Sequence, residues 1–161
     1  MINKINKLPE SEFIKVFANI FENASWIAEK LYDQKPFISF EVLSSQMINI
    51  FENSPKEKKL KILNAHPDLA DKTKISLLTP DSTNEQSSAG LDQCTEDEFN
   101  EFKKLNSIYK KFGFPFILAV KGKNKNEILD NFRKRIYSDS ETEFEEAVKQ
   151  VKKIASSRLI E

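Results

Sequence analysis

The chain has 161 residues, with 25 Lys or Arg and 25 Asp or Glu, so its formal net charge at pH 7 is zero. A balanced charge gives no net attraction to nucleic acid or to an anionic membrane, and we expect the protein to bind neither. Only three glycines occur, while Lys, Glu, Leu, Ile and Phe are abundant. This composition, in a chain of ordinary domain length, predicts a single all-α domain over residues 1–161.

Cysteine content and the chain ends bear on location. The single Cys94 excludes an intramolecular disulfide, and no Cys/His cluster has the ligand count of a structural zinc site. The N-terminal sequence MINKINKLPESEF has no apolar stretch of signal-peptide length, and the C-terminal Arg158–Glu161 is not a Ser-Lys-Leu peroxisomal signal. No window approaches the roughly 20 apolar residues of a membrane span. We therefore expect a soluble, cytoplasmic protein.

Four helices are predicted in the first 65 residues, because apolar residues recur there at three- and four-residue intervals between helix start and stop signals. They span about residues 9–20, 26–35, 39–53 and 54–65.

The next stretch, His66 to Leu91, contains the only histidine. Histidine is the one side chain whose unperturbed pKa lies near neutrality. Pro67 disfavours helical backbone at His66, so the imidazole marks a transition from helix to loop. By residue type alone, a histidine at a helix end is more often a cap or a structural residue than a catalyst.

A short helical turn is predicted over residues 72–78. Residues Pro80 to Asn84 are turn formers and capping residues, so we expect a polar loop that delivers Glu85 into the first turn of a short helix. Residues 81–88 are polar enough to be mobile. The ordinary role of a glutamate in a helical first turn is a favourable interaction with the helix dipole.

The second half of the chain predicts three more helices and one extended segment. Thr95 and Glu98 form a capping-box pattern that opens a long helix, which ends before Gly113. Residues 114–120 are apolar and have no partner strand, so we expect an extended segment there. Further helices are predicted from about 126 to 136 and from about 140 to 159.

Several strings in this sequence resemble the OHCU decarboxylase family of urate breakdown. They are HPDLA at His66–Ala70, Ser82 with Glu85 and Gln86, AGL at Ala89–Leu91, LNSIYKKFGFPFILAVKG at Leu105–Gly122 and FENASWIAEKLYDQKPF at Phe21–Phe37. The resemblance covers nearly the whole chain. It implies a bundle of about seven to nine helices with the FGFPFI segment extended beside the active site.

The resemblance also implies an activity. Enzymes of this family decarboxylate 2-oxo-4-hydroxy-4-carboxy-5-ureidoimidazoline to (S)-allantoin and carbon dioxide. The substrate carries its own electron sink, so no cofactor and no metal are expected. The partner expected of this chain is that small-molecule substrate, and the sequence leaves formation of a homodimer open.

Site residues follow from the same resemblance. His66 and Glu85 are the expected catalytic residues, with His66 as the proton carrier. Gln86 is expected to contact the ligand or the loop, and Arg158 to clamp a carbonyl or carboxylate of the substrate. The full expected substrate-binding set is Pro67, Ser82, Gln86, Phe116, Ile117, Leu118 and Arg158.

The sequence departs from the family pattern at two positions. Asp71 stands where a glycine usually follows HPDLA, and Ser138 stands where asparagine is frequent. Neither is an expected chemical group, so the departures bear on loop shape and substrate affinity. Two alternatives stay open: a helical interaction module that has lost catalysis, and a lyase or hydrolase that acts on another ureide.

Overall fold

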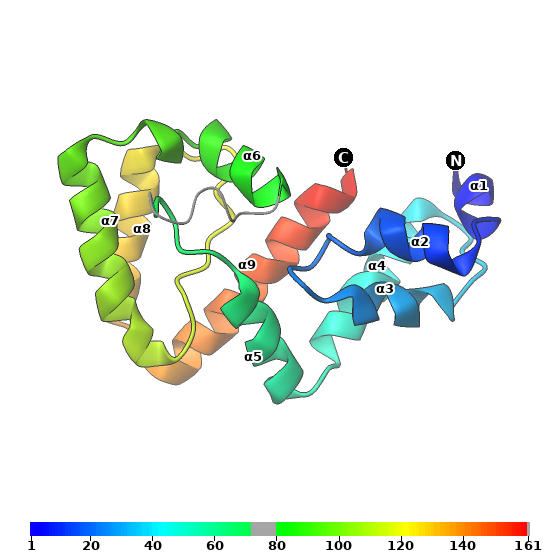
Figure 1. Ribbon diagram of the computed structural model, residues 1–161. Coiled ribbons are helices and arrows are strands. Elements are labelled where there is room, and N and C mark those ends of the chain that lie inside the picture. Colours follow the sequence, from blue (N-terminus) through cyan, green and yellow to red (C-terminus); the bar gives the residue numbers. More distant parts are fainter. Residues whose placement is uncertain (72–79, 161) are drawn as a thin grey trace. The chain divides into compact units, whose positions relative to one another are not determined.

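Helices make up the regular structure of the computed structural model, which describes residues 1–71 and 80–160 (Figure 1). No β-strand occurs within these ranges, which confirms the predicted all-α class. The chain divides into two compact units, Met1–Ala65 with Lys152–Glu161 and His66–Val151. The single-domain boundary of 1–161 stays a prediction.

The first unit is built around aromatic rings carried by short helices. Phe13, Phe21 and Phe51 are each at most 1% exposed, and α3 packs against both α2 and α4. Ser39 caps α4, because its hydroxyl oxygen accepts a hydrogen bond from the Val42 N–H at 3.2 Å. The helices are α1 (Ile2–Asn6), α2 (Glu10–Phe17), α3 (Ser25–Tyr32), α4 (Phe40–Glu52) and α5 (Lys56–Ala65).

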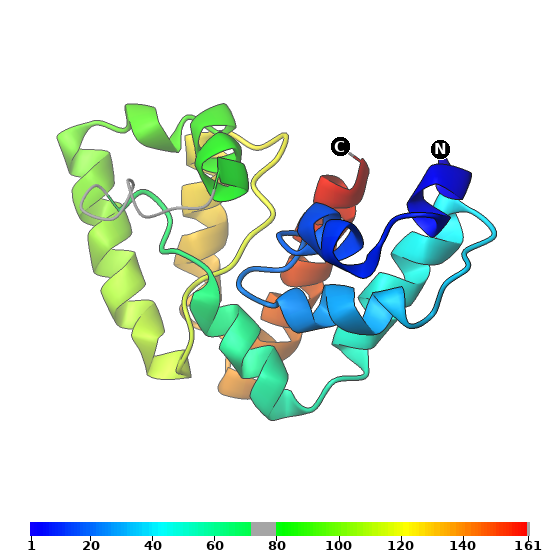
Figure 2. The same ribbon diagram turned by 45° about the vertical axis from the view of Figure 1, so that its right-hand side comes forward.

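The second unit places helices α7 and α8 side by side, in both Figure 1 and Figure 2. Residues 113–124 run from the 3-10 helix after α7 back to the start of α8, and residues 115–120 among them form neither helix nor turn (Figure 2). The predicted extended segment is therefore confirmed. The elements are α6 (Pro80–Ser88), η2 (Leu91–Gln93), α7 (Glu96–Tyr109), η3 (Lys110–Phe112), α8 (Lys125–Arg135) and the start of α9 (Ser140–Ile160), which ends in the first unit.

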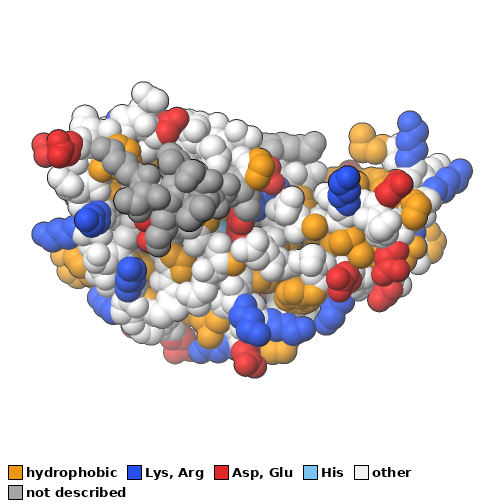
Figure 3. Space-filling model, viewed as in Figure 1, with side chains coloured by type: hydrophobic (Ala, Val, Ile, Leu, Met, Phe, Trp, Pro, Cys, Tyr) orange, Lys and Arg blue, Asp and Glu red, His pale blue; other side chains and the backbone are white. Residues whose placement is uncertain are grey.

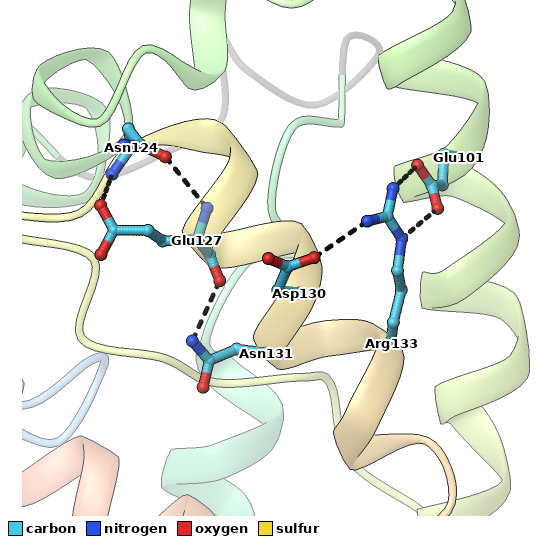
Figure 4. A network of polar contacts seen from close by, with 6 residues as sticks. All are labelled: Glu101, Asn124, Glu127, Asp130, Asn131 and Arg133. Carbon is cyan, nitrogen blue, oxygen red and sulfur yellow. Dashed lines mark hydrogen bonds and ion pairs between the residues drawn. The ribbon is translucent and has the colours of Figure 1, made fainter.

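Two capping boxes fix the starts of α7 and α8. The predicted one is confirmed, since Thr95 and Glu98 exchange hydrogen bonds of 2.8 and 3.2 Å. The second was not predicted: the Asn124 side chain accepts from the Glu127 N–H, and the Glu127 carboxylate accepts from the Asn124 N–H (Figure 4). Helix α8 therefore starts one residue before the expected Asn126.

Helix α6 corrects the prediction for the polar stretch before Glu85. The helix begins at Pro80 and runs to Ser88, so the predicted loop over Pro80 to Asn84 is wrong. Proline suits the first helical position because its fixed φ is already helical and its missing N–H has no helical partner there. Asp81 in the first turn adds a favourable dipole interaction. The predicted turn over residues 72–78 lies outside the described residues.

Charges of both signs are mixed over the face shown in Figure 3, as a net charge of zero suggests. Within the described ranges, no helix is both long and apolar enough to cross a membrane.

Candidate active site

The His66–Ala70 segment leaves helix α5 as an irregular loop. His66 directly follows Ala65, the last residue of α5, and its side chain is half-buried. Ala70 has a φ of +55°, in the left-handed region that residues with a Cβ seldom adopt. A loop with such a residue needs other contacts to hold its shape.

Two buried amide side chains supply such contacts. The Ala70 N–H donates to Oε1 of Gln86 at 3.0 Å, and Nε2 of Gln86 donates to the Asp68 carbonyl at 3.4 Å. Nδ2 of Asn106, on α7, donates to the Leu69 carbonyl at 3.1 Å. The backbone after Pro67 is therefore held from two helices.

Helix α6 carries three of the predicted site residues. Ser82 lies three and four positions before Glu85 and Gln86, which is the spacing of neighbours on one helical face. Ser82 and Gln86 are each 4% exposed, and Glu85 is half-buried. Of the two roles expected for Gln86, contact with the loop is the one seen.

The extended segment is buried and tied down at two backbone groups. Phe116, Ile117 and Leu118 are 1, 2 and 5% exposed. The Ile117 carbonyl accepts from Nη1 of Arg135 at 2.6 Å, and the Ala119 N–H donates to Oε1 of Gln150 at 3.0 Å. These bonds fix the segment from α8 and α9.

The Arg135 bond belongs to a buried polar network. Nε of Arg135 donates to Glu143 at 2.9 Å, and the Tyr109 hydroxyl also donates to Glu143. Burial, and after it the hydrogen bond to Glu143, raises the pKa of Tyr109 well above its usual value, so the hydroxyl stays protonated. The Arg135 guanidinium also lies 4.4 Å from the centre of the Phe116 ring, which stacks on Phe132 at 3.9 Å.

Several N–H groups in the segment lack an acceptor among the described residues, including those of the predicted substrate-binding residues. The N–H groups of Ile117 and Leu118 form no hydrogen bond within the part of the chain that the structure describes. Buried backbone N–H groups are nearly always paired. The segment can therefore offer donors to a ligand carbonyl or ring nitrogen.

A cavity of about 420 Å³ lies between the loop and α7. Asp68, Ala70 and Asn106 line it, together with Lys103 and Lys110. The predicted catalytic residues are not among its lining residues, so we do not assign the substrate to it.

Arg158 lies in the first unit, away in sequence from the other predicted residues. Its Nη2 donates to Glu22 at 2.9 Å, and its Nη1 donates to the carbonyls of Asn19 and Ile20 at 3.2 and 3.3 Å. The residue is 7% exposed. Its guanidinium thus fixes the chain between α2 and α3, and its role as a substrate clamp stays a prediction.

Sequence reasoning missed Asn106 and Arg135. Each carried a readable signal, because each is a polar residue at an apolar position of its helix. Asn106 lies four residues after Phe102 and three before Tyr109, and Arg135 lies three after Phe132. Polar residues on a buried helix face need partners, and here those partners belong to the site backbone.

Cys94 shows no sign of an activated thiol. Its partial burial, followed by the negative charge of Glu98, raises the pKa of the thiol above its usual value. A protonated thiol is a poor nucleophile. We expect Cys94→Ser to retain full turnover of the substrate that the family resemblance implies, measured at saturating concentration. A large loss would instead give the thiol a role.

Within residues 1–71 and 80–160, no group of three or more His, Cys, Asp or Glu residues could hold a metal ion.

Comparison with known proteins tests the resemblance to the OHCU decarboxylase family. Residues 6–160 match the family described as OHCU decarboxylase. The chain is 37% identical to the 2-oxo-4-hydroxy-4-carboxy-5-ureidoimidazoline decarboxylase of Haloferax volcanii, over 99% of this chain and 94% of that protein. It is 41% identical to the uric acid degradation bifunctional protein of Bacillus sp. (strain TB-90), over 99% of this chain.

The chain spans only 32% of that Bacillus protein. Among solved structures, the crystal structure of (S)-allantoin synthase matches with a TM-score of 0.80 and 30% identity, over 99% of this chain and 52% of that one. The predicted resemblance is confirmed by a match over nearly the full sequence and by a relative that this chain covers almost completely. The chain belongs to the OHCU decarboxylase family.

Proposed function

We propose that this protein decarboxylates 2-oxo-4-hydroxy-4-carboxy-5-ureidoimidazoline to (S)-allantoin and carbon dioxide in the breakdown of urate. The observation that carries the proposal is the family match over residues 6–160, which includes His66, Ser82, Glu85 and Gln86. The Haloferax relative named for this activity is covered over 94% of its length.

The chemistry needs orientation and one proton transfer. The substrate carries a hydroxyl and a carboxylate on one ring carbon, beside a carbon–nitrogen double bond. When the bond to the carboxylate carbon breaks, its electron pair moves into that double bond and carbon dioxide leaves. A proton is then delivered to one face of the resulting enol-like intermediate. The protein has to hold the ring, exclude water and supply that proton.

His66 is the proposed proton carrier. It is the only histidine, it is half-buried, and it lies in a loop held by hydrogen bonds from two helices. Glu85, on the same helix as the loop-binding Gln86, is proposed to orient the imidazole or to bind the ureido nitrogens. Ser82 adds a hydrogen bond to the ligand in this proposal, and Pro67 fixes the backbone of the histidine.

The extended segment is proposed to bind the flat ring of the substrate. The N–H groups of Ile117 and Leu118 are donors of the kind that a ring carbonyl or ring nitrogen accepts. The bond from Arg135 to the Ile117 carbonyl holds this backbone in place before the ligand arrives. Phe116 adds an apolar neighbour, and Arg158 completes the proposed set as the group that binds a substrate carbonyl or carboxylate.

An assay with substrate generated in place from urate tests the proposal. Protonation in free solution reaches both faces of the intermediate and gives racemic allantoin, whereas the enzyme should give a circular dichroism signal of (S)-allantoin. We expect that signal, and the release of carbon dioxide, to appear faster with the protein than without it. An inactive interaction module would accelerate neither, and an enzyme that acts on another ureide would not speed the appearance of the (S)-allantoin signal.

The proposed mechanism uses no cofactor, because the substrate's own double bond receives the electron pair. We therefore expect full activity after exhaustive treatment with a chelator and dialysis. The measurement is the rate of (S)-allantoin formation before and after treatment, beside a sample dialysed without chelator. Activity that returns only when a metal is added would refute this mechanism.

Two further points stay predictions. A cytoplasmic location is tested by fractionation of cells that make the protein. Formation of a homodimer is tested by sedimentation of the purified protein across a range of concentrations.

A further inference from the structure

Asn106 is a buried polar residue whose contact crosses a long stretch of sequence. It lies on α7, is 8% exposed, and donates from Nδ2 to the carbonyl of Leu69, which is 37 residues away. Leu69 is three residues after His66. The hydrogen bond therefore ties the proposed catalytic loop to a long, well-capped helix.

The loop needs this tie because its local backbone does not favour the observed shape. Ala70, with a φ of +55°, has a conformation that costs free energy for any residue with a Cβ. The Gln86 amide holds the two sides of Leu69, through Asp68 and Ala70. Its bond to Asp68 is long at 3.4 Å, so the bond from Asn106 is the shorter of the two made to loop carbonyls.

The carbonyl oxygen of the Asn106 side chain shows that packing alone does not explain why an asparagine occupies this buried position. Oδ1 of Asn106 is buried and has no hydrogen-bond partner among the described residues. An unpaired buried acceptor is unfavourable, and a leucine of similar size would remove it. The contact that an asparagine makes and a leucine cannot is the bond from Nδ2 to the loop.

We infer that Asn106 is a positioning residue for His66: its amide fixes the Leu69 carbonyl, and so the loop from which the imidazole reaches the substrate. This inference rests on the proposed function for its catalytic consequence. Asn106 does not touch the reacting atoms and acts through the loop.

Asn106→Leu is the test, because it removes the donor and keeps the volume. It also removes the unpaired acceptor, so the gain and the loss in stability offset each other and we expect an unfolding midpoint close to that of the parent. We expect kcat to fall ~10- to 100-fold, as displacement of a catalytic group by a fraction of an ångström to one ångström can do, with a much smaller change in KM. Asn106→Ala is the second variant if the leucine protein does not fold.

Asn131→Leu is the matched control. Nδ2 of Asn131 also donates to a carbonyl, that of Glu127 at 3.0 Å, but this bond stays within α8 (Figure 4). Asn131→Leu replaces the same type of side chain in the same unit without changing a contact to the loop. We expect its kcat and KM to match those of the parent.

A spectroscopic measurement separates positioning from stability. His66 is the only histidine, so the imidazole C–H signals in an NMR spectrum belong to it without assignment by mutation. We expect these signals and their titration midpoint to shift in Asn106→Leu and to stay in place in Asn131→Leu. Unchanged His66 signals together with an unchanged kcat per folded molecule would overturn the inference. If the parent itself fails to form (S)-allantoin, the proposed function fails, while the NMR comparison still decides whether Asn106 positions His66.

Discussion

His66→Asn should abolish most of the catalytic acceleration while leaving the protein folded. General acid–base groups contribute ~100- to 10,000-fold to enzymatic rates, and the chain has no second histidine to take over the proton transfer. Asparagine keeps a polar side chain of similar size at a half-buried loop position, so we expect little change in stability. The rate of (S)-allantoin formation, followed by circular dichroism, gives the loss.

Asn64→Ala is a suitable control for this variant. Asn64 lies two residues before His66, is exposed, and donates from Nδ2 to the Leu60 carbonyl within α5. Its replacement should leave turnover unchanged, which shows that disturbance at the end of α5 is not enough to lose activity. Near-normal turnover by a folded His66→Asn protein would refute the role of the imidazole as proton carrier.

Much of the fold could be predicted because the signals that start and end a helix lie in a few neighbouring residues. The Thr95 and Glu98 capping box was predicted from a few neighbouring residues and is confirmed. The error at α6 has the same local origin, since Pro80, Asp81 and Ser82 suit a turn and a helical first turn equally well. Contacts with residues outside the segment decide whether it forms a turn or the first turn of a helix.

The supporting contacts of the site could not be predicted in this way. The partner of Asn106 is 37 residues away, and the partner of Arg135 in the extended segment is 18 residues away. Their positions on apolar helix faces indicate burial, but which carbonyl they bind depends on how the helices pack. The motif residues were named from a family resemblance, whereas the residues that hold the motif in place needed the structure.

Arg135→Met should cost more stability than any other single substitution considered for this protein. Arg135 is 8% exposed and pairs with Glu143, which is 1% exposed. Removing one partner of a buried ion pair leaves the other charge uncompensated and typically costs ~3–5 kcal/mol. The same change takes the donor from the Ile117 carbonyl and the guanidinium from the Phe116 ring.

Arg133→Met is the matched control, on the same helix and two residues earlier. Arg133 pairs with Glu101 at 2.6 Å and with Asp130 at 3.1 Å (Figure 4), but its side chain is 48% exposed. Exposed ion pairs contribute ~0–1 kcal/mol because water already solvates both charges. The two variants remove the same charge, so the difference between their losses of stability measures the effect of burial.

Urea unfolding followed by two signals makes this comparison specific to the second unit. Far-ultraviolet circular dichroism reports on helices of the whole chain, whereas the fluorescence of Trp26, the only tryptophan, reports on the first unit. If the units unfold independently, Arg135→Met should lower the urea midpoint seen by circular dichroism more than the midpoint seen by fluorescence. If the whole chain unfolds cooperatively, the substitution should lower both midpoints together.

The double variant Arg135→Met with Glu143→Gln removes the unpaired carboxylate and should recover part of the lost stability. A cost for Arg135→Met no larger than that for Arg133→Met would mean that the buried pair contributes no more than an exposed one, and the extended segment would then owe its place to packing of Phe116 on Phe132 rather than to this network.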